Sequence, residues 1–109
     1  MSDIELRDVL EKVSRKHEIL ANPYRLLILA ILYSHKEISW SRLVEFIEEV
    51  LKLKVNPNAI NFHLTRLIEA ELLTKSILRR NTIYKVTPRI EEFKGDLEEI
   101  IKLLETLNF

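Results

Sequence analysis

The side chains best suited to specific polar contacts lie on one face of a predicted helix that begins at Asn56. That face carries Asn58, Asn61, Phe62, Thr65 and Arg66. Asparagine can bond adenine through two atoms, the threonine methyl group can pack against thymine, and arginine can bind guanine or phosphate. The pattern therefore predicts a helix that lies in the major groove of duplex DNA and reads base edges.

Two of these side chains have two interpretations each. Phe62 is apolar on an otherwise polar face, so it either contacts a thymine methyl group or a sugar edge, or packs against a neighbouring helix or hairpin. Arg66 can contact a guanine or a phosphate, and its position on the helix does not separate the two.

A β-hairpin with a basic tip is predicted directly after this helix. Residues 73–78 and 82–87 are rich in strand-forming types. Between them stand the three residues of the predicted tip, Arg79, Arg80 and Asn81. Arginines there can touch phosphates or enter the minor groove, whereas a tip that only faces solvent seldom needs two of them. Lys75 and Lys85 are expected to pair on the outer face of the hairpin and to add to its positive charge.

The chain has no net charge, but its charges are unevenly distributed. Residues 52–89 carry eight basic and two acidic side chains, a net charge of +6, whereas residues 1–51 carry −2 and residues 90–109 carry −4. The positive segment contains the polar helix face and the hairpin, as expected of a surface that contacts phosphates. A chance alternation of solvated surfaces is the alternative interpretation.

Helix start signals in the sequence predict the other helices that pack around this surface. An Asn-Pro pair caps the polar helix at residues 56–57, and a second pair at residues 22–23 starts an earlier helix that runs to about Ser34. The earlier helix is apolar at nearly every position, which predicts that it lies in the centre of the fold. A third helix begins after Ser39 and is expected to turn Trp40 into the core. The inward face of the polar helix consists of Ile60, His63, Leu64 and Leu67.

Both ends of the chain are predicted to be helical, at about residues 3–21 and 90–107, and each carries an apolar stripe with heptad spacing. The last helix can lay its stripe on its own domain, but two such helices around a compact domain are more readily explained by a partner chain. The predicted interface of a homodimer consists of Leu6, Leu10, Val13, His17, Phe93, Leu97, Ile100, Leu104 and Leu107. A cavity between these helices is the expected place for a small-molecule effector, whose existence the sequence leaves unknown.

Three motifs occur in the order found in a known family. Residues 22–29 read N-P-Y-R-L-L-I-L, residues 63–72 read H-L-T-R-L-I-E-A-E-L, and residues 84–88 read Y-K-V-T-P. In these motifs the chain resembles the winged helix-turn-helix of ArsR- and MarR-type transcription regulators, in particular small archaeal winged-helix regulators. The resemblance implies a mainly α fold with a small β-hairpin and extra terminal helices. It divides the single domain into an N-terminal dimerisation helix (1–21), a DNA-binding winged-helix core (22–88) and a C-terminal dimerisation helix (89–109).

Catalytic and metal-binding patterns are absent from the sequence. It has no cysteine, and none of its three histidines has a carboxylate or second histidine at the spacing of metal ligands. The single glycine excludes a glycine-rich phosphate loop, and no catalytic motif is present. The longest apolar run has eight residues, too short to span a bilayer. We therefore expect a cytoplasmic protein that is not an enzyme and needs no metal or cofactor.

Two classes of function remain open from the sequence. The first is sequence-specific binding of double-stranded DNA by a homodimeric transcription regulator, with repression as the simplest output. The second is a winged helix used for protein interaction, or as an architectural chromatin protein, without readout of sequence. The zero net charge and Phe62 slightly favour the protein-interaction interpretation, and the basic hairpin tip and the +6 segment oppose it.

Overall fold

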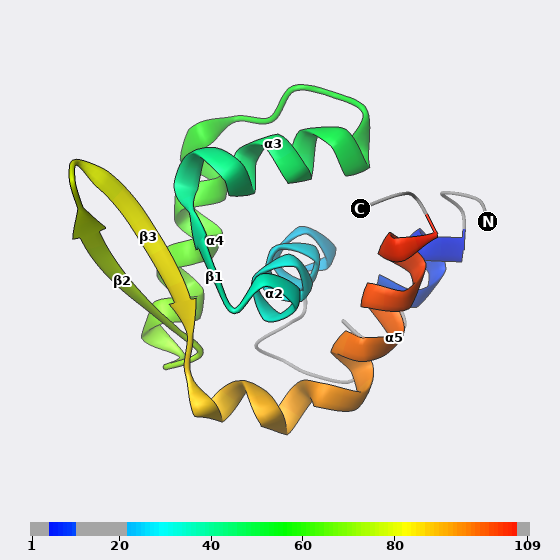
Figure 1. The fold of residues 1–109 in the computed structure, drawn as a ribbon. Coiled ribbons are helices and arrows are strands. Elements are labelled where there is room, and N and C mark those ends of the chain that lie inside the picture. The colour runs from blue at the N-terminus through cyan, green and yellow to red at the C-terminus, as the bar shows by residue number, and fades with distance from the viewer. Residues whose placement is uncertain (1–4, 11–21, 107–109) are drawn as a thin grey trace.

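The computed structural model of the protein describes residues 5–10 and 22–106. Residues 5–10 are helical. The further elements are α2 (Pro23–His35), β1 (Glu37–Ser39), α3 (Trp40–Leu51), α4 (Pro57–Glu69), β2 (Leu73–Leu78), β3 (Asn81–Val86), the 3-10 helix η2 (Pro88–Phe93) and α5 (Lys94–Glu105). The strands form one antiparallel sheet in the order β1-β3-β2, so the predicted mainly α fold with a small β-hairpin is confirmed (Figure 1).

The helices begin where their capping residues predict. The Asn22 Oδ1 atom accepts hydrogen bonds from the backbone N–H groups of Tyr24 and Arg25, at 2.8 and 3.1 Å. At the start of α4, the Asn56 Oδ1 atom accepts from the N–H of Asn58 at 2.8 Å. Ser39 caps α3 in the same way. Each cap satisfies donors that the first helical turn leaves unpaired, which fixes the first residue of each helix.

Helix α2 forms the centre of the molecule, as its sequence predicts. Every side chain from Leu26 to Tyr33 is buried. Figure 1 shows α3, α4 and α5 arranged around this helix, with the β2–β3 hairpin projecting on the side away from α5. A helix that is apolar on all sides is stable in water only when neighbours cover it completely, and these elements provide the cover.

The apolar stripe of the last helix is buried within its own chain. Phe93, Leu97, Ile100 and Leu104 all belong to the core, and α5 packs against α2. Leu6 and Leu10 of the first helix belong to the same core. The remaining residues of the predicted dimer interface, Val13, His17 and Leu107, lie outside the described residues. Burial in one chain accounts for the described part of the stripe, so the stripe no longer argues for a partner and the homodimer stays a prediction.

The sheet differs from the predicted hairpin in two ways, and the last helix differs from its prediction in one. Its tip has two residues rather than three, because Asn81 belongs to β3 and pairs with Leu78. A third strand, β1, pairs with β3 and sets Ile38 opposite Tyr84. With three residues, β1 is too short to show an alternating pattern in the sequence. The single helix predicted at residues 90–107 begins instead as η2 and continues as α5.

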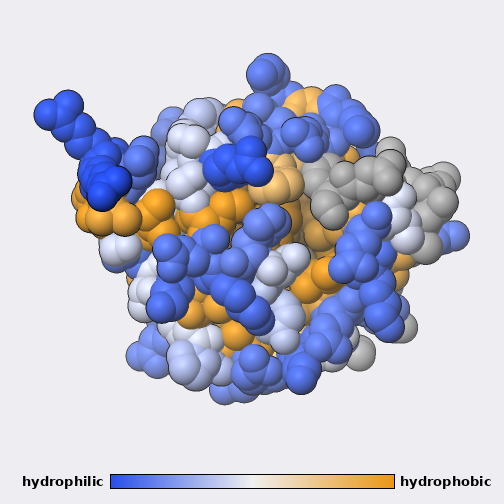
Figure 2. Space-filling view, viewed as in Figure 1, coloured by the Kyte–Doolittle hydropathy of each residue, from blue (hydrophilic) through white to orange (hydrophobic). Residues whose placement is uncertain are grey.

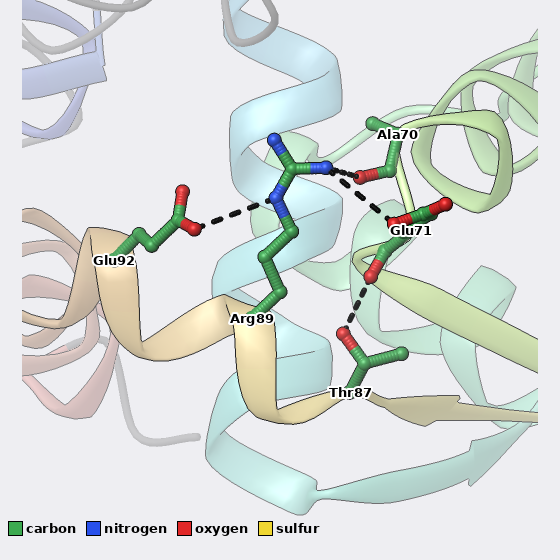
Figure 3. A network of polar contacts seen from close by, with 5 residues as sticks. All are labelled: Ala70, Glu71, Thr87, Arg89 and Glu92. Carbon is green, nitrogen blue, oxygen red and sulfur yellow. Dashed lines mark hydrogen bonds and ion pairs between the residues drawn. The ribbon is translucent and has the colours of Figure 1, made fainter.

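A polar network joins the end of α4 to the segment after β3 (Figure 3). The Arg89 Nη1 atom donates to the carbonyl oxygen of Ala70 at 2.6 Å and lies 4.0 Å from a carboxylate oxygen of Glu71. The Arg89 Nε atom lies 3.5 Å from the Oε1 atom of Glu92. The Thr87 hydroxyl donates to the Glu71 carbonyl oxygen at 2.6 Å. The network therefore fixes the end of α4 relative to the segment that follows the hairpin.

Replacing Arg89 by methionine is expected to lower the free energy of unfolding by about 1 kcal/mol, because the last turn of α4 loses a charged donor to its carbonyl groups. Urea unfolding followed by circular dichroism measures the change. Arg42→Met is the matched control. Its guanidinium lies on the surface, 3.2 Å from a carboxylate oxygen of Glu45 and 5.1 Å from the centroid of the Phe46 ring, and exposed contacts of this kind contribute little. Equal losses in the two variants would contradict a role for Arg89 at the helix end.

Candidate nucleic-acid interface

The face of α4 predicted to meet DNA points outward. Asn58, Asn61, Phe62, Thr65 and Arg66 are all exposed. The opposite face is buried at Ile60, Leu64 and Leu67. Capping at Asn56 and packing of the apolar face against the core therefore hold the helix rigidly, with its hydrogen-bonding side chains in solvent.

Phe62 lies at the surface rather than in a contact with α3 or the hairpin. Its side chain is 52% exposed. The guanidinium of Arg66 lies over its ring, 5.2 Å from the centroid, and the His63 ring meets it edge-on at 5.7 Å. Arg66 also lies 3.9 Å from Glu69. Phe62 thus supports Arg66 through a cation–π contact and remains open to a partner molecule.

Trp40 orients Asn61, a contact that the sequence did not reveal. The indole Nε1 atom donates a hydrogen bond to the Asn61 Oδ1 atom at 2.9 Å, across 21 positions of sequence. Trp40 was expected in the core but is only half-buried. Because an indole nitrogen can only donate, the Asn61 carbonyl oxygen must face Trp40. The amide NH2 group of Asn61 is then free to donate to base acceptors, which are N7 and O6 of guanine, N7 of adenine and O4 of thymine.

A polar groove of about 440 Å³ separates α4 from the hairpin. Its lining includes Asn61 and Thr65 of α4, Trp40 of α3, and Lys75 and Thr82 of the hairpin. The Thr65 hydroxyl donates to the backbone carbonyl of Asn61 at 2.9 Å, which fixes its rotamer. The groove brings a lysine from the hairpin beside the polar face of α4, so both elements can contact the same ligand.

The two hairpin lysines lie on opposite faces of the sheet, contrary to prediction. Lys75 pairs with Tyr84, whose ring is buried, whereas Lys85 pairs with Thr74 on one side and Glu37 on the other. Residues directly opposite each other in an antiparallel sheet share a face. Lys75 therefore faces the groove beside α4, and Lys85 lies on the far face next to an acidic residue.

The hairpin tip combines two arginines with two exposed apolar side chains. Arg79 and Arg80 have φ angles of 51° and 69°, the left-handed region that a two-residue hairpin turn requires. Ile77 and Leu78 beside them are 72% and 62% exposed. Figure 2 shows strongly hydrophilic side chains projecting from this tip above a hydrophobic patch. Asparagine and glycine fit such a turn with less strain, so the fold alone does not favour arginine here.

A second cationic side chain lies close behind Arg66. Arg25 of α2 is partly buried, and both its burial and the nearby Arg66 lower its pKa. The pKa of His63 lies below its usual value, mainly because the ring is partly buried and to a lesser extent because Arg25 is positively charged. His63 is therefore uncharged near neutral pH. Arg25 and Arg66 together give the middle of α4 a positive potential that favours an anionic partner.

The described residues contain neither a metal-binding cluster nor a membrane-spanning helix. In residues 5–10 and 22–106, no group of three or more histidine, aspartate or glutamate side chains is placed to hold a metal ion. No helix within the same residues is long and apolar enough to cross a membrane.

Comparison with known proteins identifies the fold. No protein-family model and no curated protein matches the chain. Among solved structures, a transcriptional regulator homologue from Pyrococcus horikoshii is similar, with a TM-score of 0.62 and 26% sequence identity over 92% of this chain and 98% of that one. The chain is a winged helix. An archaeal RosR protein, solved as a complex, has the same TM-score at 21% identity over 85% of this chain and 78% of its own.

The elements described above correspond to the standard parts of a winged helix. The hairpin β2–β3 with its Arg79-Arg80 tip is the wing, and α4 occupies the place of the recognition helix. The predicted resemblance to small archaeal winged-helix regulators is confirmed by these two structures.

Proposed function

We propose that this winged helix is a transcription regulator that binds double-stranded DNA, with α4 in the major groove and the wing over the adjacent backbone. The observation that carries the proposal is the shared groove between α4 and the wing, in which Asn61, Thr65 and Lys75 face the same space. A helix in the major groove, followed by a strand pair that contacts phosphates, is an established way to read duplex DNA. The similarity to a transcriptional regulator homologue over nearly the whole of both chains supports the same function.

We infer that the side chains of this surface have different tasks. We infer that Asn58, Asn61 and Thr65 contact base edges, with Phe62 against a thymine methyl group or a sugar. Arg66, Lys75, Arg79 and Arg80 contact phosphates, or the minor groove at the wing tip. We infer a smaller contribution to DNA contact from Asn81, which is a paired residue of β3 rather than part of the tip. Lys85 contributes only to the long-range electrostatic attraction of DNA.

We further propose that the protein acts as a cytoplasmic homodimer that represses transcription by blocking access to DNA. A two-fold dimer places two α4 helices about 34 Å apart on one face of the duplex, which doubles the contact surface. The terminal helices remain the proposed contact, through the N-terminal helix and the side of α5 that does not face α2. Sedimentation equilibrium of the full chain is expected to give a dimer at micromolar concentration. A monomer at concentrations where DNA is saturated would contradict the dimer.

A protein-interaction module is the second candidate, and the exposed Phe62, Ile77 and Leu78 are the observations that favour it. The salt dependence of binding to duplexes of arbitrary sequence separates the two. Four phosphate contacts per subunit predict that the logarithm of the affinity falls with the logarithm of salt concentration, with a slope of about −7 for a dimer that makes eight contacts. A flat dependence, or no binding at low salt, would contradict the DNA-binding proposal and support the protein-interaction module.

A further inference from the structure

The wing tip carries the two most exposed large apolar side chains of the described residues. Ile77 is 72% exposed and Leu78 is 62% exposed. They stand opposite Thr82 and Asn81 of β3, so each has a polar residue as its partner across the hairpin. Strand β2 lies at the edge of the sheet, and Leu73 is its single buried residue. Packing in the core therefore does not account for an isoleucine and a leucine at this tip.

The two apolar side chains lie on opposite faces of the hairpin, because successive residues of a strand point to opposite sides. Ile77 shares the face of Lys75, which borders the groove beside α4, and Leu78 lies on the far face. The left-handed turn at Arg79 and Arg80 ends the hairpin immediately beyond them. The end of the projecting hairpin is therefore apolar on both faces, with two cations at its point (Figures 1 and 2).

The charge around the tip indicates what kind of partner it fits. Residues 72–90, which contain the whole hairpin, carry five basic and no acidic side chains. A partner must therefore offer negative charge and an apolar surface within a few ångströms of each other. The minor groove of DNA has this combination, because phosphates line its two edges and stacked bases form its floor. The tip also continues the face of Lys75, about 7 Å further along the strand, on the same side as the groove beside α4.

We propose that the wing tip is a wedge that bends DNA. Ile77 and Leu78 enter the minor groove next to the major groove that holds α4, and they partly unstack one base step. Arg79 and Arg80 contact the phosphates on either side. Apolar side chains inserted in this way kink a duplex toward its major groove, so the bend brings more of the duplex onto α4. The wedge rests on the proposed function and extends it from contact with DNA to deformation of DNA.

Insertion gives the protein a sequence preference that needs no contact with a base edge. Pyrimidine–purine steps such as TA are the most easily unstacked, so a wedge favours a duplex that contains one. Two duplexes of identical composition and about 40 base pairs, long enough for a dimer, test this preference. One has a pyrimidine run followed by a purine run, with TA at the junction. The other has the runs in reverse order, with AT at the junction, and contains no pyrimidine–purine step on either strand.

The junction adenine of each duplex is replaced by 2-aminopurine, whose fluorescence rises when its neighbours no longer stack on it. Binding of the full chain is followed by anisotropy. We expect about fivefold higher affinity for the TA duplex than for the AT duplex. We also expect the 2-aminopurine fluorescence to rise about twofold or more in the TA complex alone. Unchanged fluorescence at saturation would overturn the wedge, and so would equal affinities for the two duplexes.

Replacing Ile77 and Leu78 by threonine removes the apolar surface and keeps every charge. Threonine is a good strand former, so the hairpin is retained. The preference for TA and the rise in fluorescence are expected to disappear, whereas the salt slope should not change, because the phosphate contacts remain. Leu53→Thr is the control, since Leu53 is 57% exposed and lies outside the groove beside the wing. It should behave as wild type. A threonine variant that keeps the preference and the fluorescence change would overturn the wedge.

Failure of the wedge and failure of the proposed function give different results. A chain that binds both duplexes with a steep salt dependence, but leaves 2-aminopurine stacked, would refute the wedge alone. A chain that binds neither duplex at low salt would refute the proposed function, and the wedge with it. If the double threonine variant sediments as a smaller species than the wild type, the two side chains contact a second copy of the chain. That result would also overturn the wedge.

Discussion

Replacing Arg79 by asparagine and Arg80 by glycine together is expected to stabilise the fold and weaken binding to all duplexes alike. Both positions have positive φ angles, which cost roughly 1 kcal/mol or more for each ordinary side chain. Asparagine and glycine adopt this turn with little strain, so the free energy of unfolding should rise by about 1–2 kcal/mol. The same change removes two phosphate contacts from each subunit, four from the proposed dimer. It should lower the affinity for DNA by at least about 10- to 100-fold and make the salt slope shallower by about 4.

Urea unfolding and fluorescence anisotropy with labelled duplexes measure the two effects separately. The matched control removes two positive charges elsewhere, through Lys94→Gln and Lys102→Gln on α5. If the wing contacts DNA, the control retains the wild-type salt slope while the wing variant does not. Equal changes of slope in both variants would mean that only the overall charge matters. A gain in stability without any loss of affinity would remove the wing from the interface.

Replacing Asn61 by alanine is expected to cost about 1–3 kcal/mol at the preferred site, which is about 5- to 150-fold in affinity, and to spare random duplexes. The loss is selective because a base-edge contact discriminates between sequences, whereas phosphate contacts do not. Affinities for the preferred site and for a scrambled duplex, measured at one salt concentration, give the comparison. Equal losses on both duplexes would mean that Asn61 only positions the helix.

Trp40→Phe is the companion variant to Asn61→Ala. It keeps an aromatic ring and removes the donor that holds the Asn61 carbonyl oxygen at 2.9 Å. The amide can then turn and present its oxygen to the N6 amino group of adenine, so the base preference at this position should shift toward adenine. An unchanged base preference would show that Trp40 does not orient Asn61 in the complex.

The features predicted correctly from the sequence are those fixed by residues close together in the chain. The Asn-Pro signals at positions 22–23 and 56–57 mark the starts of α2 and α4, because each cap bonds an N–H only two or three residues away. The outward face of α4 follows from the 3.6-residue period in the same way. Both signals are local, so tertiary contacts do not alter them.

The prediction that Lys85 lies on the same face as Lys75 was wrong, because the face depends on the exact pairing of two strands. A three-residue tip of Arg79, Arg80 and Asn81 would set Lys75 opposite Lys85. The observed two-residue tip pairs Leu78 with Asn81 and so sets Lys75 opposite Tyr84. A shift of one residue moves every side chain of a strand to the other face of the sheet. The left-handed conformation of both arginines, which closes the shorter turn, has no signal in their residue type.

Contacts between segments that are distant in the chain could not be predicted from the sequence either. The hydrogen bond from Trp40 to Asn61 joins two helices, and the polar groove beside the wing is lined by α3, α4 and the hairpin. The heptad stripe of the last helix shows a different limit, because the same pattern suits a partner chain or the chain's own core. The structure buries Leu97 and Ile100 completely within one chain. Periodicity identifies an apolar face and does not reveal what covers it.

Selection of bound sequences from a pool of random duplexes, at moderate salt, tests most directly whether this protein reads DNA sequence as a dimer. We expect an inverted repeat whose half-sites lie about one helical turn apart, with a base acceptor facing the Asn61 amide in each half-site. Retention of DNA without any enriched motif would contradict sequence readout and indicate an architectural role. No retention at any salt concentration would contradict DNA binding itself.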